Sequence, residues 1–161
     1  MRDELDAEFL FHESVFVIAG LGSPWSRRRK INFGDLLEEP WVLPHFDSLF
    51  GGFISAGFKR AGIALPIPRI ASNSMAVRVR LVEGDRFLTL LPASMLHFGA
   101  RRLRVKALPV SLPLESQAVK IVTLRGRTAN PVAKLFTEQL RACIQPDLKN
   151  DRGFPSQRTK C

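Results

Sequence analysis

The segment that most constrains this chain runs from residue 70 to residue 92, with the sequence IASNSMAVRVRLVEGDRFLTLLP. It predicts a strand, a polar loop, an amphipathic helix, a turn at Gly84, an apolar strand, and then Pro92 in the first turn of a further helix. Strands that alternate with helices in this way predict an α/β fold with a parallel sheet. In such a sheet the strand-to-helix loops lie at the carboxyl edge, where ligands bind.

The loop within this segment consists of Ser72, Asn73 and Ser74, three short side chains that form hydrogen bonds. Such side chains cap helices, and the free backbone N–H groups of a first helical turn can also hold an anion. A single loop of this kind favours the helix cap over the ligand site.

A second polar loop, His45-Phe46-Asp47-Ser48, follows the apolar strand predicted at residues 41–43. Asp47 and Ser48 can cap the next helix, or the loop can face a ligand at the same sheet edge as the first loop. Neighbouring His, Asp and Ser residues in one turn cannot form a catalytic triad, because triad members converge from separate segments.

The rest of the sequence predicts further strands and helices. Apolar runs predict buried strands, which we place at residues 15–19, 41–43, 87–91, 103–108 and 119–124. Capping residues and helical spacing predict a short helix from Asn32 and longer helices at residues 48–62 and 130–144. The last helix has an apolar stripe that is expected to be buried, formed by Val132, Leu135, Phe136, Leu140, Cys143 and Ile144.

Several segments in order resemble the effector-binding domain of LysR-type transcriptional regulators. They are LDAEFLFHESVFVIAG at residues 5–20, NFGDLLEEPWVLP at 32–44, the helix at 48–62, the block at 72–92 and NPVAKLFTEQLRACI at 130–144. Together they cover residues 5–144. One departure is that Asp85, Arg86 and Phe87 follow Gly84, where the family usually has a second Gly and small apolar residues.

The resemblance implies a periplasmic-binding-protein-like fold of type II within an effector-binding domain at residues 1–145. One Rossmann-like lobe is expected to be complete at about residues 20–114, and a partial second lobe to combine residues 1–19 with 115–145. Residues 146–161 are polar and basic and predict a disordered tail. The family begins with a helix-turn-helix and the front of a lobe, so we expect this chain to be a truncated regulator.

The resemblance also implies a site and partners. The ligand-binding residues expected in the two loops are His45, Phe46, Ser48, Ser72, Asn73 and Ser74. Helix N-termini and hydroxyl groups favour a small organic anion as effector. No cofactor, metal or catalytic residue is expected. Self-association as a dimer or higher is expected, and DNA contact only through a helix-turn-helix that this chain lacks.

The composition agrees with a cytoplasmic domain in a reducing compartment. The acidic start is not a secretory signal, and no run of 18 uncharged apolar residues predicts a membrane span. Cys143 and Cys161 have no disulfide or metal-ligand pattern and are expected to be a core residue and a tail residue. The net charge is +9, but no aromatic residues interleave with the basic clusters and no nucleic-acid motif accompanies them.

Other classes of protein remain as alternatives. A solute-binding protein of the same fold would need a secretory signal. An enzyme would need convergent acid–base residues, and His12, His45 and His97 lie in no catalytic motif. A fragment without independent function would leave residues 15–18, residues 119–124 and the stripe of the last helix partly uncovered.

Overall fold

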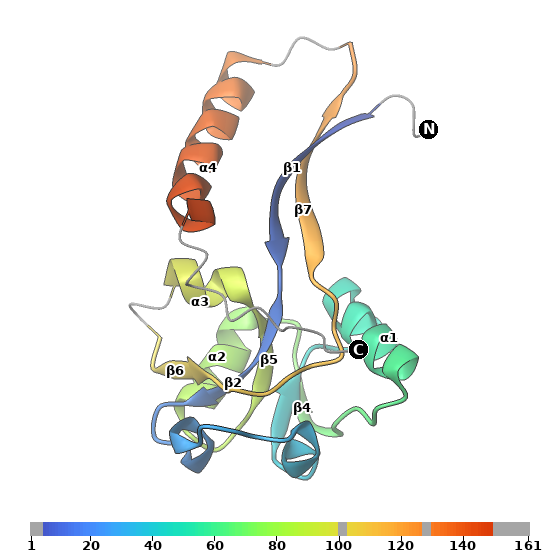
Figure 1. Cartoon of the computed structure of the whole chain (residues 1–161), viewed down its shortest axis with the longest axis vertical. Helices are drawn as coiled ribbons and strands as arrows, with labels where there is room; N and C mark the ends of the chain where they lie inside the picture. Colours follow the sequence, from blue (N-terminus) through green and yellow to red (C-terminus); the bar gives the residue numbers. More distant parts are fainter. Residues whose placement is uncertain (1–4, 100–102, 127–129, 150–161) are drawn as a thin grey trace. The chain divides into compact units, whose positions relative to one another are not determined.

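The computed structural model describes residues 5–99, 103–126 and 130–149, which form two compact units (Figure 1). The larger unit is Ser14–Ser116, and the smaller joins Met1–Glu13 to Gln117–Cys161. The division into one complete and one partial lobe remains a prediction. The apolar run at residues 15–19, expected in the partial lobe, instead pairs on both sides with strands of the larger unit and is buried there.

The larger unit contains both strands and helices. Its strands are β2 (Val15–Gly20), β3 (Trp41–Leu43), β4 (Pro68–Ala71), β5 (Thr89–Pro92) and β6 (Val105–Ala107). Its helices are the 3-10 turns η1 (Pro24–Arg27) and η2 (Phe33–Leu36) and the α-helices α1 (Leu49–Ala61), α2 (Met75–Glu83) and α3 (Ala93–Gly99). Residues 20–30 include η1, in which Ser26 is buried.

The strands of the larger unit pair in two groups, β4-β3 and β5-β2-β6, and one bridge between β3 and the residue before β5 joins the groups. β3 pairs in parallel with β4, and it meets the start of β5 in a parallel bridge between Trp41 and Leu88. β2 lies between β5 and β6 and runs antiparallel to both. The expected parallel arrangement is therefore confirmed for β3, β4 and β5, and β2 is inserted in the opposite direction. Pro92 ends β5, and α3 begins one residue later than expected.

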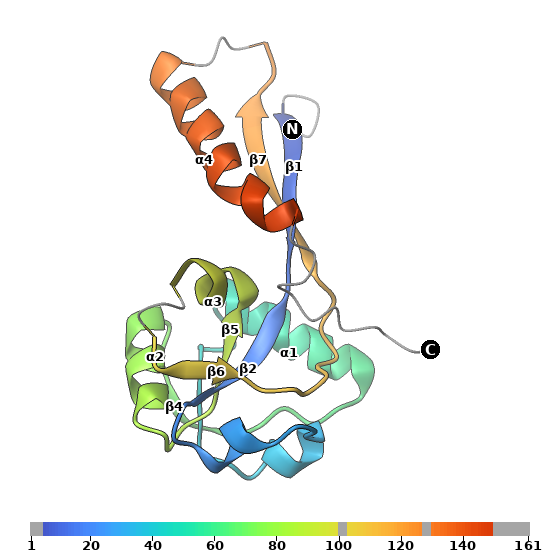
Figure 2. The ribbon, with the colours of Figure 1, turned by 60° about the vertical axis from the view of Figure 1, so that its left-hand side comes forward.

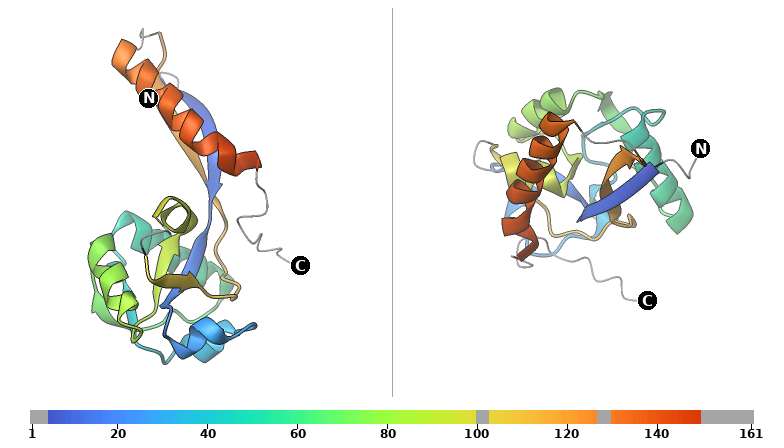
Figure 3. Two further views of the ribbon diagram at one scale, coloured as in Figure 1. Left: turned by 90° about the vertical axis from the view of Figure 1, so that its left-hand side faces the viewer. Right: turned by 90° about the horizontal axis from the view of Figure 1, so that it is seen from above.

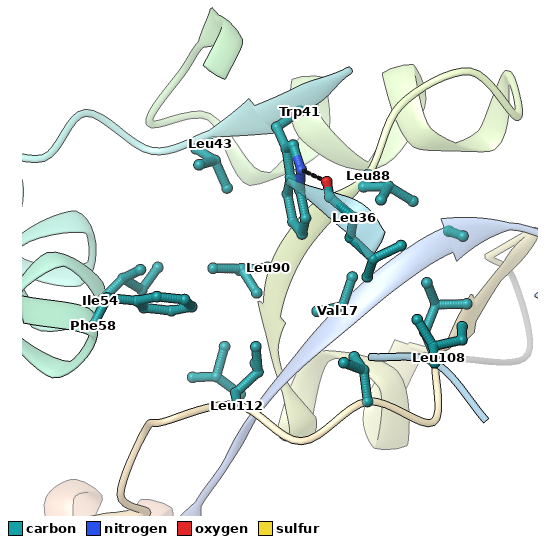
Figure 4. Close-up of a cluster of buried hydrophobic side chains, with 14 residues drawn as sticks. Val17, Leu36, Trp41, Leu43, Ile54, Phe58, Leu88, Leu90, Leu108 and Leu112 are labelled. Atoms are coloured by element: carbon teal, nitrogen blue, oxygen red, sulfur yellow. Dashed lines mark hydrogen bonds between the residues drawn. The ribbon is translucent and has the colours of Figure 1, made fainter. Parts of the chain in front are cut away.

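Helices cover both faces of this sheet, because its strands are apolar on both sides. α1 and α2 lie on opposite sides of it (Figure 2). The side chains of Ile54 and Phe58 from α1 enter one cluster of buried residues (Figure 4). In that cluster the Trp41 indole Nε1–H donates to the Leu36 carbonyl at 2.7 Å. The strand residues of the cluster are Val15, Val17, Ala19, Trp41, Leu43, Leu88 and Leu90.

The smaller unit pairs β1 (Leu5–Glu13) antiparallel to β7 (Gln117–Leu124), with α4 (Pro131–Lys149) beside β1 (Figure 3). The guanidinium of Arg141 on α4 donates to both carboxylate oxygens of Glu8 on β1, from Nε at 2.7 Å and from Nη2 at 2.5 Å. These hydrogen bonds lower the pKa of Glu8 below its usual range. The ion pair therefore fastens the helix to the strand pair.

The stripe of α4 is only partly buried, contrary to expectation. Ile144 is buried, but Val132, Leu135 and Phe136 are 72%, 59% and 66% exposed. Cys143, expected in the core, is also exposed. The apolar residues in the first turns of α4 therefore remain more than half exposed to solvent.

The end of α4 also differs from the expectation. The helix continues past Pro146 to Lys149, although proline removes one backbone hydrogen bond of a helix. The rest of the expected tail, residues 150–161, lies outside the described residues. Across the described ranges, no helix has the length and apolarity needed to cross a bilayer.

Candidate functional site

The two polar loops lie next to each other at the carboxyl edge of β3 and β4. These strands are parallel neighbours, so both loops leave the sheet on the same side. The Ser72 amide donates to the Leu43 carbonyl at 2.9 Å, and the His45 amide donates to the Asn73 side-chain oxygen at 3.0 Å. The expected juxtaposition is confirmed, whereas ligand binding by these residues remains a prediction.

Ser48 and Ser74 act as helix caps. The Ser48 hydroxyl accepts from the Gly51 amide at 3.2 Å and donates to the His45 carbonyl at 2.6 Å. The Ser74 hydroxyl accepts from the Val77 amide at 3.4 Å, and the Ser74 amide donates to the Ser72 hydroxyl at 3.2 Å. The cap interpretation is thus confirmed. It leaves the first two amides of each helix available to a ligand.

Those amides are at Leu49 and Phe50 of α1 and at Met75 and Ala76 of α2. None of them has a hydrogen-bond acceptor among the described residues, as expected for the first turn of a helix. Phe46 is 38% exposed, so one aromatic ring also borders this edge at the surface. The two helix N-termini, with their partial positive charges, converge on one place.

A buried arginine behind the loops was missed by the sequence analysis. Arg78 of α2 is 1% exposed. Its Nη1 donates to the Leu90 carbonyl at 2.9 Å, and its Nη2 lies 3.1 Å from the Met75 sulfur. Its guanidinium carbon lies 5.6 Å from the centre of the Phe50 ring, within cation–π range. Because Phe50 and Met75 belong to the first turns of α1 and α2, the guanidinium lies between those turns.

The backbone pairing of β3 explains why the Leu90 carbonyl accepts a hydrogen bond from Arg78. The Val42 amide donates to the Leu88 carbonyl at 2.9 Å, so the next amide along β3 in this ladder would be at position 44. That residue is Pro44, which has no N–H. The Leu90 carbonyl is left without a backbone donor from β3, and Arg78 supplies one.

The charge of Arg78 is not balanced within the described residues. No carboxylate among them forms an ion pair with Arg78, and its Nε has no hydrogen-bond partner. Burial lowers the pKa of the guanidinium, but arginine stays protonated at neutral pH. Burying an unpaired ion of this kind lowers the stability of a protein by roughly several kcal/mol. The sequence did contain a signal for this burial, because position 78 shares one helical face with positions 75, 79 and 82, and the last two of these are buried valines.

Gly51 keeps α1 close to the loop of residues 45–48, and this close approach yields a stability prediction. A Cβ at Gly51 would lie well under 3.0 Å from the His45 carbonyl, whereas a Cβ at Gly52 would lie 3.4 Å from the Phe46 carbonyl. Gly51→Ala is expected to destabilise the protein by about 1–3 kcal/mol through this clash. Gly52→Ala, the matched control, is expected to stabilise it by about 0.5–1 kcal/mol through helix propensity. Thermal melts of both variants test this, and changes of the same sign would contradict it.

The turn after Gly84 has the conformation that usually favours glycine. Asp85 has a φ of 64°, in the left-handed region that Asp tolerates better than most residues. Its carboxylate accepts from the Gly22 amide at 2.8 Å. Beside it lies a hollow of about 210 Å³ at the amino edge of the parallel strands, away from the polar loops. It is lined by Ser23, Pro24, Trp25, Arg28, Glu39, Asp85, Arg86 and Leu88.

Comparison with known proteins gives consistent matches. Residues 1–144 match the family model described as the LysR substrate binding domain. The HTH-type transcriptional regulator GalR of Pseudomonas putida is 26% identical over 142 residues, covering 88% of this chain but 34% of GalR. This chain therefore spans about a third of that relative's length.

Solved structures show the fold. The regulatory domain of CcmR from Synechocystis PCC6803, in complex with 2-PG, has a TM-score of 0.69 and 17% identity, covering 88% of this chain and 68% of that one. The effector-binding domain of QuiR in complex with shikimate has a TM-score of 0.62 and 17% identity, covering 89% of this chain and 67% of the QuiR chain. The expected α/β fold of the periplasmic-binding-protein-like type II class is confirmed.

Proposed function

Since this chain belongs to the family of LysR substrate-binding domains, we propose that it binds a small organic anion on the two polar loops and thereby serves transcriptional regulation. The residues proposed to contact the effector are His45, Phe46, Ser48, Ser72, Asn73 and Ser74. The larger unit is proposed to be the complete lobe of the domain. The proposal contains no catalytic step, because the family consists of transcriptional regulators.

The observation that carries this proposal is the convergence of two helix N-termini. The amides of Leu49, Phe50, Met75 and Ala76 have no acceptor among the described residues. An anion at one such terminus gains about 0.3–1 kcal/mol when the site is exposed and more when it is partly buried. The effectors in the CcmR and QuiR complexes support a small organic molecule as the ligand class.

Amide shifts during a ligand titration test this proposal. Adding sodium benzoate, sodium succinate or inorganic phosphate to the ¹⁵N-labelled chain is expected to shift the amides of residues 45–51 and 72–77. Benzylamine at the same concentration is expected to leave them in place, because the helix termini repel a cation. Two-dimensional NMR spectra at constant pH and ionic strength provide the measurement.

The controls test separately where the ligand binds and whether its negative charge matters. Responsive amides clustered around Arg104 and Lys106 instead would show that the assigned site is wrong. A response to benzylamine but not to the acids would show that the electrostatic argument is wrong. If Ser72→Ala and Ser74→Ala bind the acids as the wild type does, these hydroxyls serve only as caps.

Regulation requires that the effector prefer one conformational state over another, because equal affinity for both shifts nothing. We propose that DNA is contacted by a helix-turn-helix outside these 161 residues. On the same basis we place the protein in the cytoplasm, where it would meet DNA. Both statements derive from the family and from GalR, which is named as an HTH-type regulator.

We also propose that the chain self-associates through the smaller unit. Val132, Leu135 and Phe136 stand at helical spacing on one face of α4 and are all more than half exposed. In the described residues β1 and β7 form a two-stranded sheet, so each has an unpaired edge. A two-stranded sheet is marginal alone. A second copy would cover the apolar face and complete the sheet.

A further inference from the structure

We infer that Arg78 recognises the charge of the effector, holding an anionic group through the free edge of its guanidinium between the first turns of α1 and α2. This inference rests on the proposed function and deepens it, since it names the residue that selects a carboxylate or phosphate group. The guanidinium is held in place by Leu90, and Met75 covers its free edge.

The first argument is the direction of the unused donors. Nη1 is occupied by the Leu90 carbonyl. Nε and Nη2 form the other edge of the planar group, the edge that binds a carboxylate or phosphate through two parallel hydrogen bonds. Nε has no partner, and Nη2 has only the Met75 sulfur, at 3.1 Å. A thioether is a weak acceptor, so this edge keeps most of its capacity to bind.

The second argument is electrostatic. A cation near a helix N-terminus is unfavourable, because the macrodipole already places partial positive charge there. Arg78 reaches the N-terminal turns of two helices, through Met75 of its own helix and Phe50 of the other. None of the ion pairs formed between described residues involves Arg78. An anion at this place would satisfy the guanidinium and both helix termini together.

The third argument concerns access to the buried group. Arg78 is 1% exposed, but the group over its free edge is the side chain of Met75, which is partly buried. Methionine is unbranched and adapts its rotamers readily, so it can move without a backbone change. An oxygen of the anion would take the place of the Met75 sulfur at Nη2. The geometry therefore combines a fixed cation with a movable cover.

The test compares Arg78→Met and Arg78→Lys with Arg80→Met in the full chain. Arg80 lies on the same helix, but its side chain is 84% exposed and pairs with Glu83, so this control removes the same charge from the surface. The probes are sodium benzoate, sodium succinate and inorganic phosphate, with affinity read from loop amide shifts. Arg78→Met is expected to weaken the binding of the acids roughly tenfold or more. The affinity of Arg78→Lys for the acids is expected to lie between those of the wild type and Arg78→Met. The affinity of Arg80→Met is expected to match that of the wild type within about twofold.

A second readout uses the wild-type protein and does not depend on how the variants fold. The side-chain Nε–H resonance of Arg78 is expected to shift downfield as benzoate or phosphate is added, because that group gains an acceptor. Met75→Ala is expected to tighten the binding of the same probes, since it removes the cover. No movement of the Nε–H resonance while the loop amides respond would overturn the inference.

The outcomes separate this inference from the proposed function. If the loop amides respond to the acids equally in wild type and Arg78→Met, Arg78 is a structural residue and the proposed function stands. If no loop amide responds to any acid in the wild type, the proposed function fails and this inference fails with it. If binding is lost equally in Arg78→Met and Arg80→Met, the effect is one of overall charge and the inference is wrong.

Discussion

Replacing Trp41 with alanine is expected to destabilise the larger unit by about 3–5 kcal/mol. Trp41 is completely buried and is the largest such side chain of the described residues. It lies in β3, and its ring is in the same cluster as Leu43, Leu88 and Leu90 (Figure 4). Domains of this size are stable by about 5–15 kcal/mol in total, so the loss is a large fraction. Urea unfolding followed by far-UV circular dichroism measures it.

Two further variants identify the origin of this loss. Trp41→Phe keeps an aromatic ring in the core but removes the indole N–H that donates to the Leu36 carbonyl, which still accepts from the Glu39 amide at 3.2 Å. The loss of this one hydrogen bond is expected to cost about 0.5–1.5 kcal/mol. Trp25→Ala is the matched control, because Trp25 is only partly buried at the border of the same cluster. A loss for Trp41→Ala no greater than that for Trp25→Ala would contradict the central place of Trp41.

The chain is expected to form dimers or larger assemblies at micromolar concentration, and Leu135→Lys or Phe136→Lys is expected to raise the dissociation constant roughly tenfold or more. Each substitution would place a charge on the exposed apolar face of α4, where a second copy would have to bury it. Sedimentation equilibrium over a range of concentrations measures the change.

Lys134→Ala serves as the control for self-association. Lys134 is exposed on the opposite side of α4 from Leu135 and Phe136, so its removal is expected to leave the assembly intact. If the wild-type chain sediments as a compact, folded monomer at roughly tens of micromolar, the proposal is contradicted, because the apolar face of α4 would then need no partner.

Local chemistry explains which parts of the fold were predictable. Ser48 and Ser74 were expected to cap helices, and both do, because a hydroxyl before a helix has a nearby amide to bind. Gly62 was expected to end a helix, and it has a φ of 66° there. The two site loops were expected at one edge because parallel strands place their carboxyl ends together, and β3 and β4 do so.

The features that were missed depend on contacts that a pattern does not encode. Arg78 lies in the segment VRVR, where helical spacing places it on the face of the buried Val79 and Val82, but spacing does not show what an arginine there would contact. Its partner is the Leu90 carbonyl, which has no donor from Pro44. The stripe of α4 was predicted correctly as amphipathic, but periodicity cannot say whether a face is covered. Likewise, an apolar run at residues 15–19 shows burial without showing which strands lie beside it.

The central position of β2 has a consequence for the order in which the chain folds. β2 is the first strand of the larger unit to leave the ribosome, but its partners β5 and β6 begin only at Thr89 and Val105. Pairings between such distant segments form late, because a long loop must close first. During synthesis, Val15–Gly20 is therefore an apolar strand without its partners. We expect it to be a binding target for chaperones until about ninety further residues have emerged.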